Sequence, residues 1–209
     1  MMGVCLRSGK APSPTLCQLV ASAVSDTRLP ILHLTKRLVS PPMDARGEPL
    51  AGVTLVTGAG PAEIACWLEI QRLAFADQPT KFRPPTEADL RRELLDREGW
   101  RPNWLRFAVV PESTVADAHH LRLAGGYAVG TVALAIWAGR ETRRAVIHRL
   151  AVVPQARRRG IGRLLLAAAE LAAWEAGHRH LWLETHARWE AAVALYRSQG
   201  WEAAQAQRG

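Results

Sequence analysis

The chain has 209 residues, of which 48% are hydrophobic and 22% charged, a composition typical of a globular protein with a packed core. No apolar run reaches the ~18 residues that a membrane-spanning helix needs, so we expect neither a membrane span nor a membrane partner. The formal net charge of +8 permits nucleic acid, an anionic surface or an anionic small molecule as partner, and does not choose among them.

The cysteines are scattered and lack the spacing of metal ligands: Cys5, Cys17 and Cys66. We interpret them as free thiols in a reducing compartment, which indicates a cytoplasmic protein without a metal site. A weakly apolar stretch at 16–25 faintly resembles an export signal, but it is short and interrupted by polar residues.

Residues 1–50 show no sustained hydrophobic period. The stretch SPPMDARGEP at 40–49 is rich in turn-forming residues, which is typical of a linker. We therefore predict a poorly structured N-terminal extension and linker over 1–50, followed by one folded domain over 51–209.

Local patterns predict a strand, two helices and two strands in the first part of this domain, at 52–58, 60–77, 84–100, 105–111 and 127–137. The second helix begins with a capping-box pattern in which Thr86 caps the helix and Asp89 stands three residues later. His119 and His120 fall in the polar loop between the two later strands, where we expect them to be solvated.

The second part of the domain alternates strand and helix, at 145–154, 157–177, 178–186, 187–200 and 201–206. Such strand–helix–strand units after a hairpin-rich first part favour an α/β fold of the mixed-sheet (α+β) kind, with helices flanking a central sheet.

The sequence RRRGIGR at 157–163 lies between a predicted strand and a predicted helix. Helix N-termini present unpaired N–H groups and a partial positive charge, and glycines let an anion approach the backbone closely. The pattern is not a P-loop, and Leu165 stands where a dinucleotide fingerprint needs its third glycine. We therefore predict a turn that binds a phosphate or pyrophosphate.

Two segments resemble the GCN5-related N-acetyltransferase (GNAT) superfamily. Residues 148–177 resemble its acetyl-CoA-binding motif, Arg/Gln-x-x-Gly-x-Gly/Ala, which is matched by Arg157, Gly160 and Gly162. Residues 184–202 resemble its later motif, Ala-x-x-Leu-Tyr-x-x-x-Gly-Phe/Trp. The order and spacing of the two segments are those usual in the family.

The resemblance implies a GNAT acetyltransferase domain over 51–209 that uses acetyl-CoA as acyl donor and needs no metal. It implies that the pantetheine arm pairs with the strand at Leu150, Ala151 and Val152. It also implies that the pyrophosphate lies on the glycine-containing turn, formed here by Arg157, Arg158, Arg159, Gly160, Ile161, Gly162 and Arg163.

Tyr196 is the candidate general acid. It shares a helical stripe with Trp189 and Val193, so spacing alone favours a tyrosine of the core. The resemblance implies instead that it protonates the departing sulfur of coenzyme A, while a neutral amine attacks the thioester directly.

His148 is the candidate general base. Many family members carry a glutamate on this strand, and Val146 stands at that position here. His148 matches the histidine of the arylalkylamine acetyltransferases, and alternation puts it on one strand face with Leu150 and Val152. The alternative is a strand histidine satisfied by a backbone partner.

The next predicted strand projects four side chains to one face, which either line an acceptor pocket or lie on the surface: His180, Trp182, Glu184 and His186.

The sequence departs from the family at two places. Trp189 stands where the family often has a cofactor-contacting asparagine, and only residues 201–209 follow Gly200, where two strands are usual. The final strand is therefore expected to be missing, truncated or replaced, and a catalytically degenerate acyl-CoA-binding protein or sensor is the alternative function.

The expected partners are acetyl-CoA and an unidentified amine, and a homodimer is left open. Nucleic acid is not expected, because neither a recognition-helix pattern nor an aromatic platform accompanies the arginines.

Overall fold

The computed structural model describes residues 31–42, 50–77, 83–111, 121–138 and 143–204. Eight strands form one mixed sheet, in the order β2 (Thr54–Thr57), β3 (Leu105–Val110), β5 (Gly126–Ala138), β6 (Arg143–Val152), β7 (His180–His186), β1 (Ile31–Arg37) and β8 (Glu202–Ala203), with β4 (Arg122–Leu123) paired to β5. Outside the described residues lie the stretch at 16–25, Cys5, Cys17, His119 and His120.

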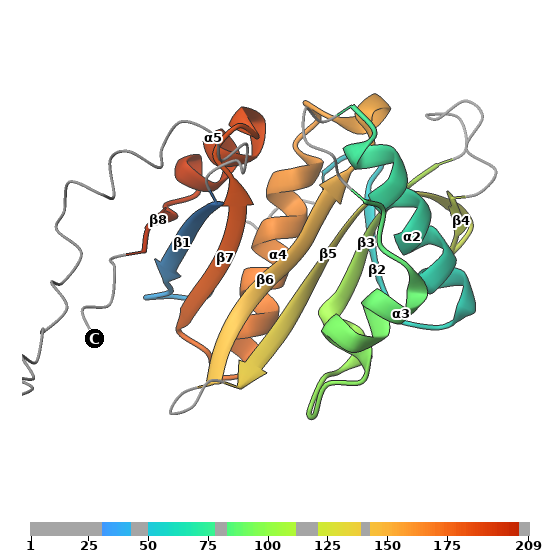
Figure 1. Cartoon of the computed structure of the whole chain (residues 1–209). Coiled ribbons are helices and arrows are strands. Elements are labelled where there is room, and N and C mark those ends of the chain that lie inside the picture. The colour runs from blue at the N-terminus through green and yellow to red at the C-terminus, as the bar shows by residue number, and fades with distance from the viewer. Residues whose placement is uncertain (1–30, 43–49, 78–82, 112–120, 139–142, 205–209) are drawn as a thin grey trace, which may run out of the picture.

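Helices flank the sheet on both faces, as predicted (Figure 1). They are α2 (Pro61–Phe75), α3 (Glu87–Leu90), α4 (Ile161–Glu175) and α5 (Glu190–Ser198). In Figure 1, α4 lies behind the sheet, and α2 and α3 lie in front of it. Apolar side chains from α2, the strands and α4 form one continuous core, in which Trp67 and Phe107 are completely buried.

The second predicted helix is shorter and less regular than expected. Its capping box is confirmed, since Asp89 N donates to Thr86 Oγ1 at 3.2 Å and Thr86 N donates to the Asp89 carboxylate at 2.9 Å. After Leu90 the chain continues as a π-helical turn, η2 (Arg91–Leu95), and the helix does not reach residue 100.

Residues 31–37 form a strand of the sheet, so the prediction of a poorly structured extension over 1–50 is wrong for this segment. β1 pairs antiparallel with all seven residues of β7, from Ile31 opposite His186 to Arg37 opposite His180. Within the strand only Leu34 is fully buried, so the sequence lacks the alternation of buried and exposed residues that would predict a strand here. Its partner strand lies about 150 residues away and gives no local signal.

β1 occupies an inner position in the sheet, although it comes first among the described strands. It lies between β7 and the short β8, which pairs with it at Leu34 and Thr35. The short strand predicted at 201–206 is present as β8, and the strand between it and β7 comes from before the predicted domain boundary.

Lys36 ties β1 to α4 on the other side of the core. Its Nζ lies 2.9 and 2.8 Å from the two carboxylate oxygens of Glu170, a residue that is only 3% exposed. Trp201 Nε1 donates to the same carboxylate at 2.8 Å. This buried carboxylate therefore receives its charge compensation from the N-terminal strand.

We expect Lys36→Met to lower the free energy of unfolding by about 3 kcal/mol, because it leaves a buried carboxylate without its cation. Urea denaturation of the full chain measures this loss. The added change Glu170→Gln removes the unpaired charge, so the double variant should regain most of the lost stability. A loss below about 1 kcal/mol for Lys36→Met, the value of an exposed ion pair, would contradict the assignment.

Candidate functional site

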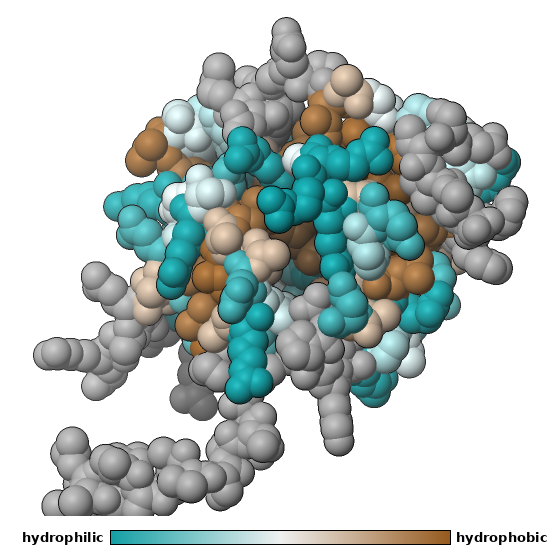
Figure 2. Space-filling view, turned by 90° about the horizontal axis from the view of Figure 1, so that it is seen from above, coloured by the Kyte–Doolittle hydropathy of each residue, from teal (hydrophilic) through white to brown (hydrophobic). Residues whose placement is uncertain are grey.

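A cleft opens where β6 and β7 separate. The two strands pair in parallel at only two positions, Ala145 opposite Leu181 and Val146 opposite Trp182. Beyond them lies a cleft of about 1090 Å³. Figure 2 looks down onto this end of the molecule, where apolar residues lie in a hollow rimmed by hydrophilic ones. Because β7 diverges, the β7-facing backbone edge of β6 at Leu150–Val152 has no neighbouring strand in the described sheet.

The N-terminus of α4 lies at the mouth of the cleft. Gly160 takes the left-handed conformation at the N-cap, with φ of +82°, and no side chain caps the helix. The N–H groups of the first helical turn have no partner within the helix, so they can receive an anion. Gly162 packs closely against α5, since a Cβ there would lie 3.2 Å from Leu195 Cδ2 and that side chain would have to shift by a few tenths of an ångström.

Most of the predicted cofactor-binding residues line this cleft: Leu150, Ala151, Val152, Arg157, Arg158, Gly160, Ile161, Gly162 and Arg163. Arg159 does not line it. Sequence reasoning missed other lining residues, among them Ile31, Leu50, Phe75 and Trp137. Two of these precede the predicted domain, and none belongs to a recognisable motif.

Arg157 holds the turn in place. Its guanidinium forms an ion pair with Asp77 at 2.6 Å and donates to the carbonyl oxygens of Ala74 at 2.7 Å and Val152 at 3.2 Å. The first residue of the motif thus joins the glycine-containing turn at 157–163 to the end of α2 and to β6.

A β-bulge interrupts β6 inside the cleft. Arg149 has φ of +54°, and its carbonyl oxygen accepts a hydrogen bond from Gln71 Nε2 of α2 at 3.1 Å. The pairing with β5 shifts by one residue across the bulge. His148 consequently shares a face with Ala151, and the predicted common face with Leu150 and Val152 is wrong, because alternation fails at a bulge.

His148 lines the cleft and is mostly buried. Its Nε2 lies 2.9 Å from Oε2 of Glu93, and its ring meets the edge of Trp137 at 5.7 Å between centroids. Burial lowers the pKa of the imidazole, with Arg149 and Arg97 acting in the same direction and Glu93 against them. The ring is therefore neutral at pH 7, as a proton acceptor must be.

Tyr196 of α5 also lines the cleft and is only 7% exposed. Its ring packs against Trp201 with centroids 6.2 Å apart. Burial raises the pKa of the phenol, so the hydroxyl keeps its proton throughout the physiological range. The residue predicted as the general acid therefore lines the cleft with its hydroxyl protonated.

Trp189 lies at the start of α5, where the family pattern has asparagine. Its ring contacts Phe75 and His186 with centroids 5.0 and 4.6 Å apart. Trp189 thereby joins α2, β7 and α5 by aromatic contacts at the cleft wall.

The four side chains predicted on one face of β7 divide into two pairs. Glu184 and His186 line the cleft, and Glu184 pairs with His33 of β1 at 3.3 Å. His180 and Trp182 do not line it and contact each other instead, with ring centroids 4.8 Å apart.

Cys66 is a buried free thiol, in keeping with the prediction for this residue. Its Sγ donates to the carbonyl oxygen of Arg122 at 3.5 Å, and burial raises its pKa to about 11. Among the described residues, no group of histidine, cysteine and acidic side chains could hold a metal ion. Within the same residues, no helix is long and apolar enough to cross a membrane.

Solved structures share this architecture. A GCN5-related N-acetyltransferase from Sphaerobacter thermophilus is similar over 83% of this chain, with 25% identity and a TM-score of 0.60, although the chain spans only 48% of that protein. The NatC complex bound to Gag peptide and CoA gives 20% identity and a TM-score of 0.53, covering 71% of this chain and 83% of that one. An acetyltransferase from Streptococcus agalactiae 2603 has 16% identity and a TM-score of 0.55, and the match covers 76% of this chain and 88% of that one.

No curated protein matches the chain. The sequence model of the acetyltransferase (GNAT) family, however, matches residues 69–201, which include the whole cleft-forming unit from β6 to α5. This chain therefore belongs to the GNAT acetyltransferase family.

Proposed function

We propose that this protein is an N-acetyltransferase that transfers the acetyl group of acetyl-CoA to an amine. The observation that carries the proposal is the cleft between β6 and β7, with an uncapped helix N-terminus at its mouth. The NatC structure, which shares the fold, contains CoA, and this supports the binding of a CoA-containing donor here.

The residues of the cleft fit the two polar parts of the donor. The free N–H groups at the start of α4 suit the pyrophosphate, and Arg158 and Arg163 add positive charge beside them. The backbone edge of β6 at Leu150–Val152 suits the amide groups of the pantetheine arm, which pairs there as an added strand would. Arg157 positions this turn through Asp77 instead of contributing a free charge.

Two residues carry the proposed proton transfers. His148, neutral and lining the cleft, accepts the proton that the amine loses as it attacks the thioester carbonyl. Tyr196 gives its proton to the sulfur of coenzyme A as the carbon–sulfur bond breaks. The nitrogen–carbon bond of the amide forms in the same sequence.

A second function has support in particular residues. Val146 stands in place of the usual glutamate, and Trp189 packs on Phe75 where an asparagine often contacts the cofactor. A chain that binds acetyl-CoA without acetylating any amine would be an acyl-CoA-binding protein or sensor.

Binding of the donor acetyl-CoA is tested by changing two glycines, one just before α4 and one just after it. Gly160 and Gly177 both have φ above +80°, and neither Cβ would meet a close contact, so each change to alanine costs about 1 kcal/mol of stability. We expect only Gly160→Ala to weaken acetyl-CoA binding, by roughly tenfold, when titrated calorimetrically. Equal affinities of the two variants would contradict binding at this turn.

Turnover is tested by the release of free thiol from acetyl-CoA in the presence of a panel of amines. On an amine that the wild-type chain acetylates, we expect Tyr196→Phe to lower kcat roughly 100-fold, because the proton donor is lost. The phenyl ring keeps its contact with Trp201, so stability and acetyl-CoA affinity should not change. An unchanged kcat would remove Tyr196 from the role of acid. Tight acetyl-CoA binding without thiol release on any amine would favour the sensor.

A further inference from the structure

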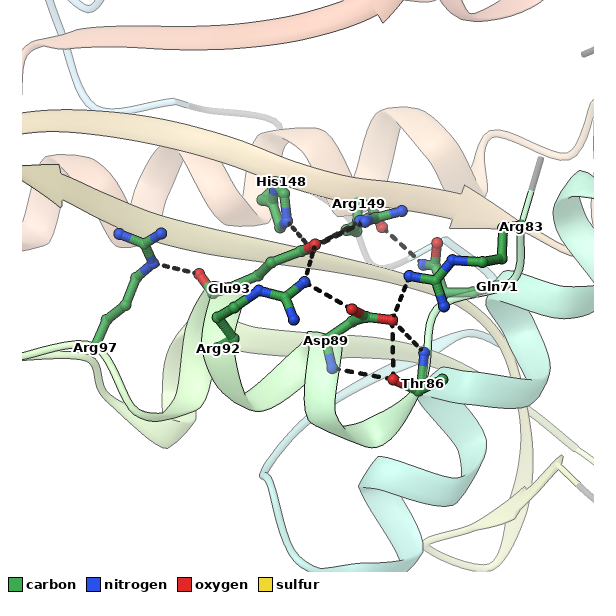
Figure 3. Close-up of polar contacts among 9 residues, drawn as sticks. All are labelled: Gln71, Arg83, Thr86, Asp89, Arg92, Glu93, Arg97, His148 and Arg149. Carbon is green, nitrogen blue, oxygen red and sulfur yellow. Dashed lines mark hydrogen bonds and ion pairs between the residues drawn. The ribbon is translucent and has the colours of Figure 1, made fainter. Parts of the chain in front are cut away.

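Two backbone irregularities face each other beside the cleft (Figure 3). One is the π-helical turn Arg91–Leu95, marked by the hydrogen bond from Asp96 N to the carbonyl oxygen of Arg91. The other is the bulge of β6 at Arg149. Irregularities of both kinds are frequent at functional sites, where they redirect a side chain. Here the π-helical turn carries Glu93, and the bulge lies where two neighbouring residues of β6, His148 and Arg149, contact the Glu93 carboxylate.

Glu93 accepts hydrogen bonds from two consecutive residues of β6. His148 Nε2 lies 2.9 Å from Oε2, and Arg149 reaches both oxygens, with Nη2 at 3.1 and 2.9 Å. In a regular strand, neighbouring side chains point to opposite faces, so the bulge is what allows both to meet one carboxylate. The hydrogen bond from His148 and the charge of Arg149 hold the pKa of Glu93 at about 2.

The ionised state of Glu93 determines which nitrogen of His148 carries hydrogen. A carboxylate can only accept, so Nε2 must be the donor in this contact. The imidazole is neutral, and its Nδ1 is then the basic atom. His148 lines the cleft and Glu93 does not, so the ring lies between the carboxylate and the space where an amine would enter.

We propose that Glu93 is the positioning residue of His148: its carboxylate keeps hydrogen on Nε2 and leaves Nδ1 as the atom that accepts a proton from the acceptor amine. The inference rests on the proposed function, because it assigns a purpose to the base of that reaction. Arg149 compensates the charge of Glu93, so the carboxylate orients the imidazole without keeping it protonated.

The charged groups around the ring come from two elements. Glu93 and Arg92 lie on the π-helical turn, Arg97 follows that turn and donates from Nε to the Glu93 carbonyl at 2.6 Å, and Arg149 lies on β6. Of these, only Glu93 raises the affinity of His148 for a proton. Removing its charge therefore leaves the arginines unopposed and moves the titration of the ring to lower pH.

The first test is NMR of the imidazole nitrogens in the full chain labelled with ¹⁵N-histidine, with His148→Gln used to assign the signal. We expect the Nε2–H tautomer in the wild type. Glu93→Gln should keep the Nε2–H tautomer, since the amide oxygen still accepts a hydrogen bond from Nε2. It should lower the midpoint of the His148 titration by about one pH unit. Glu93→Ala should also mix the tautomers. A wild-type Nδ1–H tautomer, or an unchanged signal in Glu93→Ala, would overturn the proposal.

Asp89→Ala is the matched control. Asp89 lies one turn earlier and binds Arg83 and Arg92, and no hydrogen bond or ion pair joins it to His148 in Figure 3. This variant should lose stability by weakening the helix start while the His148 signal stays in place. A shift equal to that of Glu93→Gln would mean that loosening of this segment, and not the Glu93 carboxylate, moves the signal, and would overturn the proposal.

The second test links the contact to the reaction. On the amine that gives the highest thiol release, the acidic limb of kcat/KM should move to lower pH in Glu93→Gln by the same amount as the NMR midpoint. A purely structural Glu93 would leave that limb unmoved, and this result would overturn the inference. Because the NMR needs neither acetyl-CoA nor an amine, a correct tautomer without turnover on any amine would refute the proposed function instead.

Discussion

The early separation of β6 and β7 is the constraint on which the site depends. After two paired positions, the peptide groups on one edge of β6 have no partner strand among the described residues, and such groups need a partner of some kind. α4 begins beside this edge with a turn whose N–H groups are also unpaired. One cleft thus brings together two sets of unpaired backbone groups, and the proposed function rests on this arrangement.

The separation persists because each strand is held from its far side. β6 pairs along β5, and β7 pairs along its entire length with β1, so neither strand is free to close the gap. Arg157 fixes the mouth of the cleft by joining the turn to Asp77 after α2. Inside the cleft, the bulge at Arg149 costs local strand pairing, and Gln71 donates a hydrogen bond to the backbone carbonyl oxygen of Arg149 in its place.

The sequence predicts those parts of the molecule that local patterns determine. The glycines at 160 and 162, the apolar repeat of α4 and the Thr86 capping box each act within a few residues, and all three are found where expected. β1, the bulge and the π-helical turn depend on partners far along the chain, and no local pattern announces them. Glu93 could not be predicted for the same reason, because its partners on β6 are distant in the sequence. In the sequence it is one acidic residue of a predicted surface helix.

The position of β1 in the chain has a consequence for the order of assembly. This strand leaves the ribosome before every other described element, yet its neighbours β7 and β8 are the last of the described strands to be made. β1 therefore cannot pair until β7 has been made, and Lys36 has no carboxylate partner until Glu170 of α4 has been made. Contacts of such long sequence separation slow folding, so pairing of β1 should be a late step in reaching the native state.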